Sequence, residues 1–184
     1  MSTEAQILPN HERPQFQGIV RRFHPDDVSA LKPILETWIK NRHTGELIPE
    51  EVADDLDQME KSYTGENDIT YLVAEENGEV LGVMGFRPPE EKMKQYGTTE
   101  NPAELINAYV SNDHRHGKGV GTALIRALEE QARLKGHTEI ILNSGPRYQF
   151  SGWGFYIKQY GKPVGKAIGM YGKGGDAPIW RHLL

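Results

Sequence analysis

The sequence predicts an α/β (α+β) fold in which helices flank a mixed, mostly antiparallel central sheet. Three observations carry this prediction: two amphipathic helical patterns near the start of the chain, an Asn77-Gly78 dipeptide between two β-rich runs, and a strand, a helix and a strand in succession over residues 104–143. The last pattern is a βαβ unit, whose two strands run parallel. We therefore expect one parallel pair in an otherwise antiparallel sheet.

The first expected elements are a short strand and two helices. Residues 18–23 are rich in β-forming side chains, and residues 24–27 bring the proline and the acidic groups that favour the first turn of a helix. The apolar stripe of that helix consists of Val28, Leu31, Ile34, Leu35, Trp38 and Ile39. Residues 49–62 repeat the same kind of start and spacing, which predicts a second helix.

A β-hairpin is expected next. Residues 69–75 and 79–86 flank Asn77-Gly78, and a type I′ turn needs the positive φ angles that Asn and Gly tolerate. Residues 88–103 are rich in proline, glycine and polar groups and predict an irregular loop, which leads into a strand over residues 104–110. Two antiparallel strands therefore precede the βαβ unit.

The helix of the βαβ unit is expected over residues 119–135. Val120, Leu124, Ala127, Leu128 and Leu134 form one apolar face, and Gly136 follows as a terminator. Residues 138–143 then predict a buried strand. From residue 144 onward the chain is rich in glycine and aromatic residues, and strands are expected near 164–171 and 178–183.

Length and composition favour one soluble domain. The chain has 184 residues, of which 37% are hydrophobic and 26% charged, so we expect a single domain over 18–184 after a flexible tail over 1–17. No apolar stretch approaches the roughly 20 residues that a membrane-spanning helix needs. The polar start of the chain also lacks the pattern of a signal peptide, so a cytoplasmic location without a membrane partner is expected.

Charge and residue types exclude several function classes. The formal net charge of −5 argues against nucleic acid as a partner, since such binding needs a basic face. The chain has no cysteine, which excludes disulfides, a thiol nucleophile and thiolate metal ligands. His114 and His116 form a His-x-His pattern without an evident third ligand, so no metal site is expected.

A glycine-rich loop lies between the strand and the helix of the βαβ unit. Its sequence is His116-Gly117-Lys118-Gly119-Val120-Gly121. Backbone N–H groups and a helix N-terminus can converge there on a phosphate, although glycines can also serve a tight turn alone. The spacing matches neither a Walker P-loop nor the G-x-G-x-x-G of dinucleotide sites, so ATP and NAD lose support.

The loop resembles the signature Q/R-x-x-G-x-G/A of the GNAT superfamily, with His116 where Gln or Arg is usual and Arg115 one place early. The resemblance covers about residues 18–161 and includes the Asn77-Gly78 hairpin and Phe155-Tyr156. It implies acetyl-CoA as co-substrate and no metal. By the same resemblance the cofactor-binding residues are Val110, Ser111, His116, Gly117, Lys118, Gly119, Val120, Gly121, Thr122 and Asn143.

The resemblance implies an acyltransferase that moves an acetyl group from acetyl-CoA to a primary amine of a small molecule or amino acid by direct attack. An alkyl amine is mostly protonated at neutral pH, with a pKa of about 10.4, so a base must act. Glu104, at the start of the strand before the loop, resembles the family's base, with a water relay as the alternative. Tyr156 resembles its general acid, and Tyr148, Gln149 and Tyr160 are alternatives.

Other functions stay open at this stage. Protein or peptide N-acetylation and non-catalytic acyl-CoA binding would use the same loop, and a nucleotide-binding or regulatory domain is a more distant alternative. Backbone amides near Val110 and Ser111 are expected to stabilise the thioester oxygen. Arg87 and Arg147 are candidates for binding a substrate carboxylate. Residues 165–184 are expected to add edge strands, to shape the acceptor pocket and to contribute to a homodimer.

Overall fold

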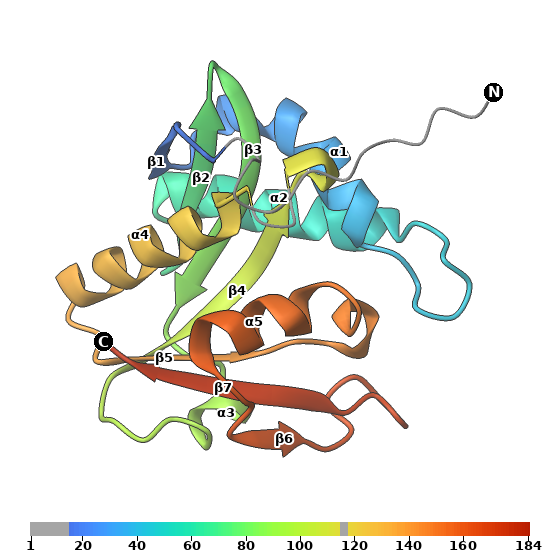
Figure 1. Ribbon diagram of the computed structural model, residues 1–184, viewed down its shortest axis with the longest axis vertical. Helices are drawn as coiled ribbons and strands as arrows, with labels where there is room; N and C mark the ends of the chain where they lie inside the picture. The colour runs from blue at the N-terminus through green and yellow to red at the C-terminus, as the bar shows by residue number, and fades with distance from the viewer. Residues whose placement is uncertain (1–14, 115–117) are drawn as a thin grey trace.

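A seven-stranded sheet with helices on both faces forms the protein (Figure 1). The computed structural model describes residues 15–114 and 118–184. The strand order is β1-β2-β3-β4-β5-β7-β6. Within this described part, only β4 and β5 pair in parallel, and the other neighbouring strands are antiparallel. The predicted mixed, mostly antiparallel sheet is therefore confirmed.

The N-terminal elements follow the sequence prediction closely. They are β1 (Ile19–Arg22), α1 (Val28–Trp38), α2 (Pro49–Thr64), β2 (Thr70–Glu76) and β3 (Glu79–Arg87). At the hairpin between β2 and β3, Asn77 has a φ of 54° and Gly78 a φ of 79°. Both angles are positive, as a type I′ turn requires.

Two apolar cores lie on opposite faces of the sheet. Leu31 and Leu35 of α1 and Leu56 and Met59 of α2 pack on one face. The other face is covered by α4 (Val120–Leu134) and α5 (Gly152–Tyr160), which pack against the same core residues (Figure 1). The sheet therefore separates α1 and α2 from α4 and α5.

Strand β4 (Pro102–Val110) diverges from its parallel neighbour β5 (Glu139–Asn143). They pair only where Pro102, Ala103 and Glu104 face Glu139, Ile140 and Ile141. Beyond Glu104, β4 continues along β3, whereas β5 continues along β7 (Ala177–Leu183). The sheet is consequently open between the C-terminal ends of these two strands.

A β-bulge shapes the diverging part of β4. The register with β3 shifts between Val83 and Gly85, so that Asn107 and Ala108 together stand opposite the single residue Met84. Asn107 takes a φ of 48°, in the left-handed region that non-glycine residues rarely adopt. A bulge bends its strand and redirects side chains, so the side-chain direction along β4 changes at this point.

The C-terminal third differs most from the sequence prediction. Helix α5 lies in a segment for which no helix was predicted, because its glycines and aromatic residues have weak helix propensity. A short helix, α3 (Glu91–Lys94), and the first residues of β4 occupy the predicted loop. Strand β6 (Gly165–Ala167) is shorter than predicted, and β7 is not an edge strand, since it pairs with both β5 and β6.

Residues at the N-terminal end of the first described range contact the start of α4. The backbone N–H of Phe16 donates to the carbonyl oxygen of Lys118 at 2.7 Å, and the Phe16 ring packs against the core of the α4 face. Residues 15–17 therefore lie against the start of α4. Among the described residues, no helix combines the length and the apolar character needed to cross a membrane.

Candidate functional site

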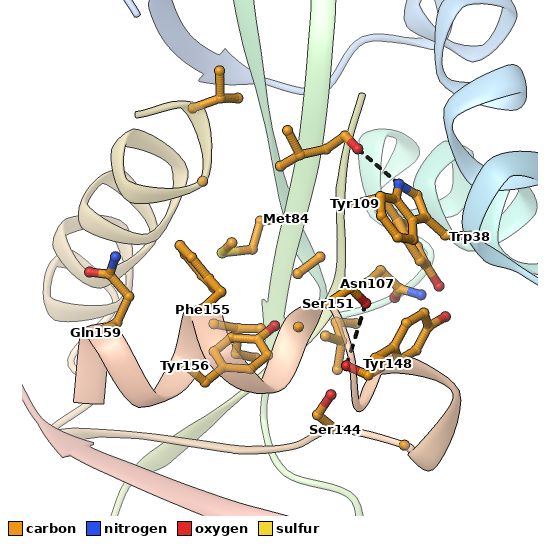
Figure 2. A pocket seen from close by; sticks show the side chains of 18 of the residues that line it. Trp38, Met84, Asn107, Tyr109, Ser144, Tyr148, Ser151, Phe155, Tyr156 and Gln159 are labelled. Atoms are coloured by element: carbon orange, nitrogen blue, oxygen red, sulfur yellow. Dashed lines mark hydrogen bonds between the residues drawn. The ribbon is translucent and has the colours of Figure 1, made fainter. Parts of the chain in front are cut away.

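A cavity of about 1370 Å³ opens between the diverging ends of β4 and β5 (Figure 2). It is lined by residues of α2, β4, α4 and α5 and by the segment that joins β5 to α5. In Figure 2, Phe155, Tyr156 and Gln159 approach it from α5, while Trp38 and Tyr109 lie across it. The cavity therefore connects the α4 and α5 face of the sheet with the α1 and α2 face.

The N-terminus of α4 forms one end of this cavity. Gly119 is its N-cap and has a φ of 88°, a conformation that favours glycine. Val120, Gly121 and Thr122 form the first turn, whose backbone N–H groups have no carbonyl partner within the helix. Together with the helix dipole, these groups can bind an anion such as a phosphate. The predicted loop residues His116 and Gly117 lie outside the described residues.

Gly121 and Thr122 also join α4 to α5. A Cβ atom on Gly121 would lie 3.0 Å from Cε2 of Phe155, so only glycine allows this approach without a shift of the ring. The Thr122 hydroxyl accepts a hydrogen bond from Nε2 of Gln159 at 3.0 Å. These contacts hold α5 beside the N-terminal end of α4.

The end of β4 presents one of the two predicted amide donors to the cavity. The N–H of Ser111 donates to the Leu81 carbonyl oxygen at 2.7 Å and is thus used within the sheet. Backbone groups of adjacent residues in a strand point to opposite edges. The Val110 carbonyl accordingly faces away from β3 and accepts from Nε1 of Trp38 at 2.8 Å (Figure 2). The Val110 N–H lies on the same edge, where the sheet is open.

Tyr156 lies in the wall of the cavity. Its ring is buried between Phe155 and Trp180, with centroid separations of 5.3 and 5.4 Å. Burial raises the pKa of the Tyr156 hydroxyl well above its usual range, so this group stays protonated at neutral pH. It is therefore suited to donate a proton rather than to accept one.

The alternatives to Tyr156 are placed differently. Tyr148 also lines the cavity, and burial raises the pKa of its hydroxyl. Gln149 and Tyr160 are not among the lining residues, and the Tyr160 hydroxyl donates to Oε1 of Glu129 at 2.9 Å. The structure thus brings Tyr148 and Tyr156 together at the cavity and leaves Tyr160 in a separate interaction.

Glu104 lines the cavity where β4 and β5 begin to diverge. Its buried carboxylate accepts from Nε of Arg87 at 3.3 Å and from the backbone N–H of Glu90 at 3.0 Å. Asn143, at the end of β5, accepts from the Tyr171 hydroxyl at 2.6 Å. Both predicted residues therefore reach the cavity with partners already in place.

Asp55 of α2 was not predicted from the sequence, yet it lines the same cavity. Its Oδ2 atom accepts from the Tyr109 hydroxyl at 3.0 Å, and the nearby Asn107 side chain of the β4 bulge acts to lower the pKa of the carboxyl group. Burial raises the pKa of Asp55 to about 6. Glu51, Asp55 and Gln58 all line the cavity at i, i+4, i+7 spacing, and this polar stripe was the available sequence signal.

The raised pKa of Asp55 predicts a pH-dependent stability. The folded-state pKa of about 6 lies above the usual value of 3.8 for an aspartate, so the folded protein binds this proton more tightly than the unfolded chain. The cost of burying the charge is absent below the unfolded pKa and fully present above the folded one. Asp55→Asn is therefore expected to raise the free energy of unfolding at pH 8 by up to about 3 kcal/mol.

Denaturant unfolding from pH 4 to pH 8 checks this expectation. The difference between Asp55→Asn and the wild type should grow as the pH rises through the range from about 4 to about 6. Asp57→Asn is a matched control, since Asp57 is exposed on the same helix and pairs with Lys61 at 2.6 Å. If the difference in unfolding free energy between Asp55→Asn and the wild type were constant across the pH range, it would contradict the burial of the Asp55 charge.

The two arginines predicted to receive a substrate carboxylate are already paired. Arg87 bonds to Glu104, and its guanidinium also forms an ion pair with Glu90. NH1 of Arg147 lies 2.8 Å from Oε2 of Glu51. Within the described ranges, no group of three or more acidic, histidine or cysteine residues is arranged to hold a metal ion.

Comparison with known proteins adds evidence on the family. Residues 33–169 match the acetyltransferase (GNAT) family. Human N-acetyltransferase 8 is 28% identical over 139 residues, which is 76% of this chain and 58% of that relative. The chain spans about half the length of the curated relatives that it matches.

Solved structures show the same fold at low sequence identity. A protein assigned to the GNAT family from Desulfovibrio desulfuricans superposes with a TM-score of 0.72 at 20% identity, covering 90% of this chain and 98% of that one. An aminoglycoside 6'-N-acetyltransferase complexed with coenzyme A gives a TM-score of 0.64 at 19% identity, covering 90% and 96%. These two likenesses concern the fold.

Proposed function

This chain belongs to the acetyltransferase (GNAT) family, and we propose that it transfers the acetyl group of acetyl-CoA to a primary amine of a small molecule or amino acid. The cavity between β4 and β5 carries the proposal, because it joins the phosphate-binding end of α4 to an acceptor space beside α2. A cofactor and an acceptor could thus meet from opposite faces of the sheet. A cytoplasmic location and a homodimer stay predictions.

The residues at the α4 end suit the pyrophosphate of acetyl-CoA. The first-turn amides of α4 are free to bind an anion, and Lys118, Arg126 and Lys158 also line the cavity. The fold neighbour with bound coenzyme A supports this cofactor. Acetyl-CoA would supply an activated thioester, and Val110 and Asn143 would lie along its acyl and pantetheine arm.

Direct attack by the amine requires a group that accepts the amine proton and a hydrogen-bond donor that stabilises the oxyanion. The amine nitrogen forms a bond to the thioester carbon, the C–S bond breaks, and the amine loses its proton. Glu104 is the proposed base and would act through a water molecule, because its carboxylate is already bonded to Arg87. The Val110 N–H would stabilise the oxyanion that develops on the thioester oxygen.

The departing thiolate requires a proton, and Tyr156 is the proposed donor. Its position in the cavity and the raised pKa of its buried hydroxyl support this role. Tyr148 is the alternative that also reaches the cavity. Direct transfer with a general acid forms no covalent enzyme intermediate, which agrees with a chain that has no cysteine.

The test measures coenzyme A release and the mass of the acetylated product with purified full-length protein. Small amines, amino acids and lysine-containing peptides are offered separately. The proposal expects amine-dependent thiol release and a product heavier by one acetyl group with at least one small amine. Product formation with peptides alone would instead support a peptide N-acetyltransferase. Binding of acetyl-CoA without turnover of any amine would support a non-catalytic acyl-CoA-binding module.

A further inference from the structure

The charges that line the cavity are segregated between the two faces of the sheet. Lys118, Arg126 and Lys158 lie toward α4 and α5, and none of them forms an ion pair with a carboxylate within the described part of the chain. On the opposite face, α2 contributes Asp54 and Asp55 to the lining. The end of the cavity beside α4, which suits phosphates, is therefore basic. The end beside α2, where the acceptor is proposed to bind and which we call the acceptor end, is acidic.

Pairing within the acceptor end leaves a net negative charge there. Its cations are Arg87, Lys92 and Arg147, and each already forms an ion pair with Glu90, Glu104 or Glu51. Asp54 and Asp55 form no ion pair with a described residue. A carboxylate on the acceptor would find its natural partners occupied, whereas a cation would find two carboxylates.

Asp55 is held in place by a polar network from β4 and β2. The Tyr109 hydroxyl donates to its Oδ2 at 3.0 Å, and the Asn107 side chain of the bulge interacts with the carboxylate from nearby. The oxygen of Asn107 in turn accepts from the Tyr71 hydroxyl at 2.8 Å, which orients the Asn107 amide. The positive φ of Asn107 lies at the bulge of β4, so this network is part of the strand that borders the cavity. The neutral Tyr109 hydroxyl thus orients Asp55 without neutralising its charge.

The geometry points to Asp55 as the residue that binds a second, protonated nitrogen of the acceptor, so that the preferred acceptors are diamines or polyamines rather than amino acids. This inference rests on the proposed function and names the substrate class of the same site. An ion pair in a partly buried position is stronger than one on the surface. The reacting nitrogen would then lie toward β4 and Tyr156, and the second nitrogen toward α2.

Matched acceptors test the inference directly. Cadaverine and 6-aminohexanoate carry an ammonium group and a carboxylate on the same five-carbon spacer, and pentylamine is the five-carbon amine without a second charged group. Putrescine and spermidine vary the spacing. The wild type is expected to give a kcat/KM for the best diamine about 10-fold or more above that for pentylamine. Aminohexanoate should be the poorest of the three matched acceptors.

Asp55→Asn should reduce the ratio of kcat/KM between diamine and pentylamine by about 10-fold. Asparagine retains the size of the side chain and can still accept from Tyr109, and the ratio cancels any general loss of activity. Asp57→Asn, on the exposed face of the same helix, should leave the ratio unchanged. An equal loss with all acceptors, or a wild type that prefers aminohexanoate, would overturn the inference.

A pH profile separates binding of a cation from a structural role. Since burial raises the pKa of Asp55 to about 6, the KM for cadaverine should rise as the pH falls through 6 in the wild type. The charged or titratable groups around Asp55 are Glu51, Asp54, Tyr71, Tyr109, Arg147 and Tyr148. The rise should be absent in Asp55→Asn, and its persistence there would assign it to another group.

The outcomes also distinguish this inference from the proposed function. If pentylamine is acetylated but the diamines show no advantage, acetyl transfer stands and only the role of Asp55 fails. If no amine is acetylated and acetyl-CoA does not bind in a calorimetric titration, the proposed function itself fails.

Discussion

Replacing Gly119 with valine is expected to raise the dissociation constant for acetyl-CoA by roughly 100-fold, the loss of a few charge-assisted hydrogen bonds. Gly119 caps α4 with a φ of 88°, and a branched side chain there would shift the first turn of the helix. Its Cβ would also lie only 3.2 Å from Oε1 of Gln15. The amides of the first turn, which are proposed to bind the anion, would therefore lose their alignment.

Gly136 offers a matched control at the other end of the same helix. Its φ is 84°, and no atom lies within 4 Å of the position of an added Cβ. Gly136→Val should thus carry a similar backbone cost, about 1–2 kcal/mol, without touching the cavity. Isothermal titration of both variants, with thermal unfolding alongside, checks the prediction. Equal weakening of acetyl-CoA binding by both substitutions would contradict the assigned role of the α4 N-terminus.

Tyr156→Phe is expected to lower kcat for acetyl transfer by about 100-fold, the usual contribution of a general acid. The KM for acetyl-CoA should change little, because the ring and its packing against Phe155 and Trp180 are retained. The departing thiolate would have to take its proton from water instead. Steady-state kinetics at saturating amine measure the effect.

Two further phenylalanine substitutions test which tyrosine acts as the general acid. Tyr160→Phe should have little effect on kcat, since the Tyr160 hydroxyl is bonded to Glu129 and does not line the cavity. Tyr148→Phe tests the alternative that does reach the cavity. A full loss of kcat in Tyr148→Phe together with an active Tyr156→Phe would transfer the role to Tyr148.

Local sequence patterns were sufficient to predict most of the helices and strands of the fold. The turn at Asn77-Gly78 depends on two residues that tolerate positive φ, and both adopt it. The amphipathic pattern over residues 119–135 corresponds to α4, which runs from Val120 to Leu134. These elements could be predicted because neighbouring residues along the chain determine them.

Features that depend on distant residues were missed. Helix α5 contains Gly152 and Gly154, and it is stabilised by packing against the core of the α4 face, which local propensity does not show. The divergence of β4 from β5 after Glu104 likewise follows from pairing with β3 and β7. Neither feature has a local sequence pattern.

The same contrast between local patterns and distant contacts explains which site residues could be predicted from the sequence. Gly119 was predicted from a motif that is contiguous in sequence. Asp55 stands among several acidic residues of α2, of which Asp57 is merely exposed and paired with Lys61. The hydrogen bond from Tyr109, more than fifty positions away, and the place of Asp55 in the cavity lining distinguish it from Asp57. A catalytic or binding role that depends on such a contact can be recognised only from the three-dimensional structure.

The most direct test of the central claim is a calorimetric titration of the purified protein with acetyl-CoA, with ATP and NAD in parallel. The cavity between β4 and β5 predicts binding of acetyl-CoA with a dissociation constant on the order of micromolar and no comparable heat from either nucleotide. Binding of ATP or NAD without binding of acetyl-CoA would contradict the assignment of the glycine loop and the mechanism built on it.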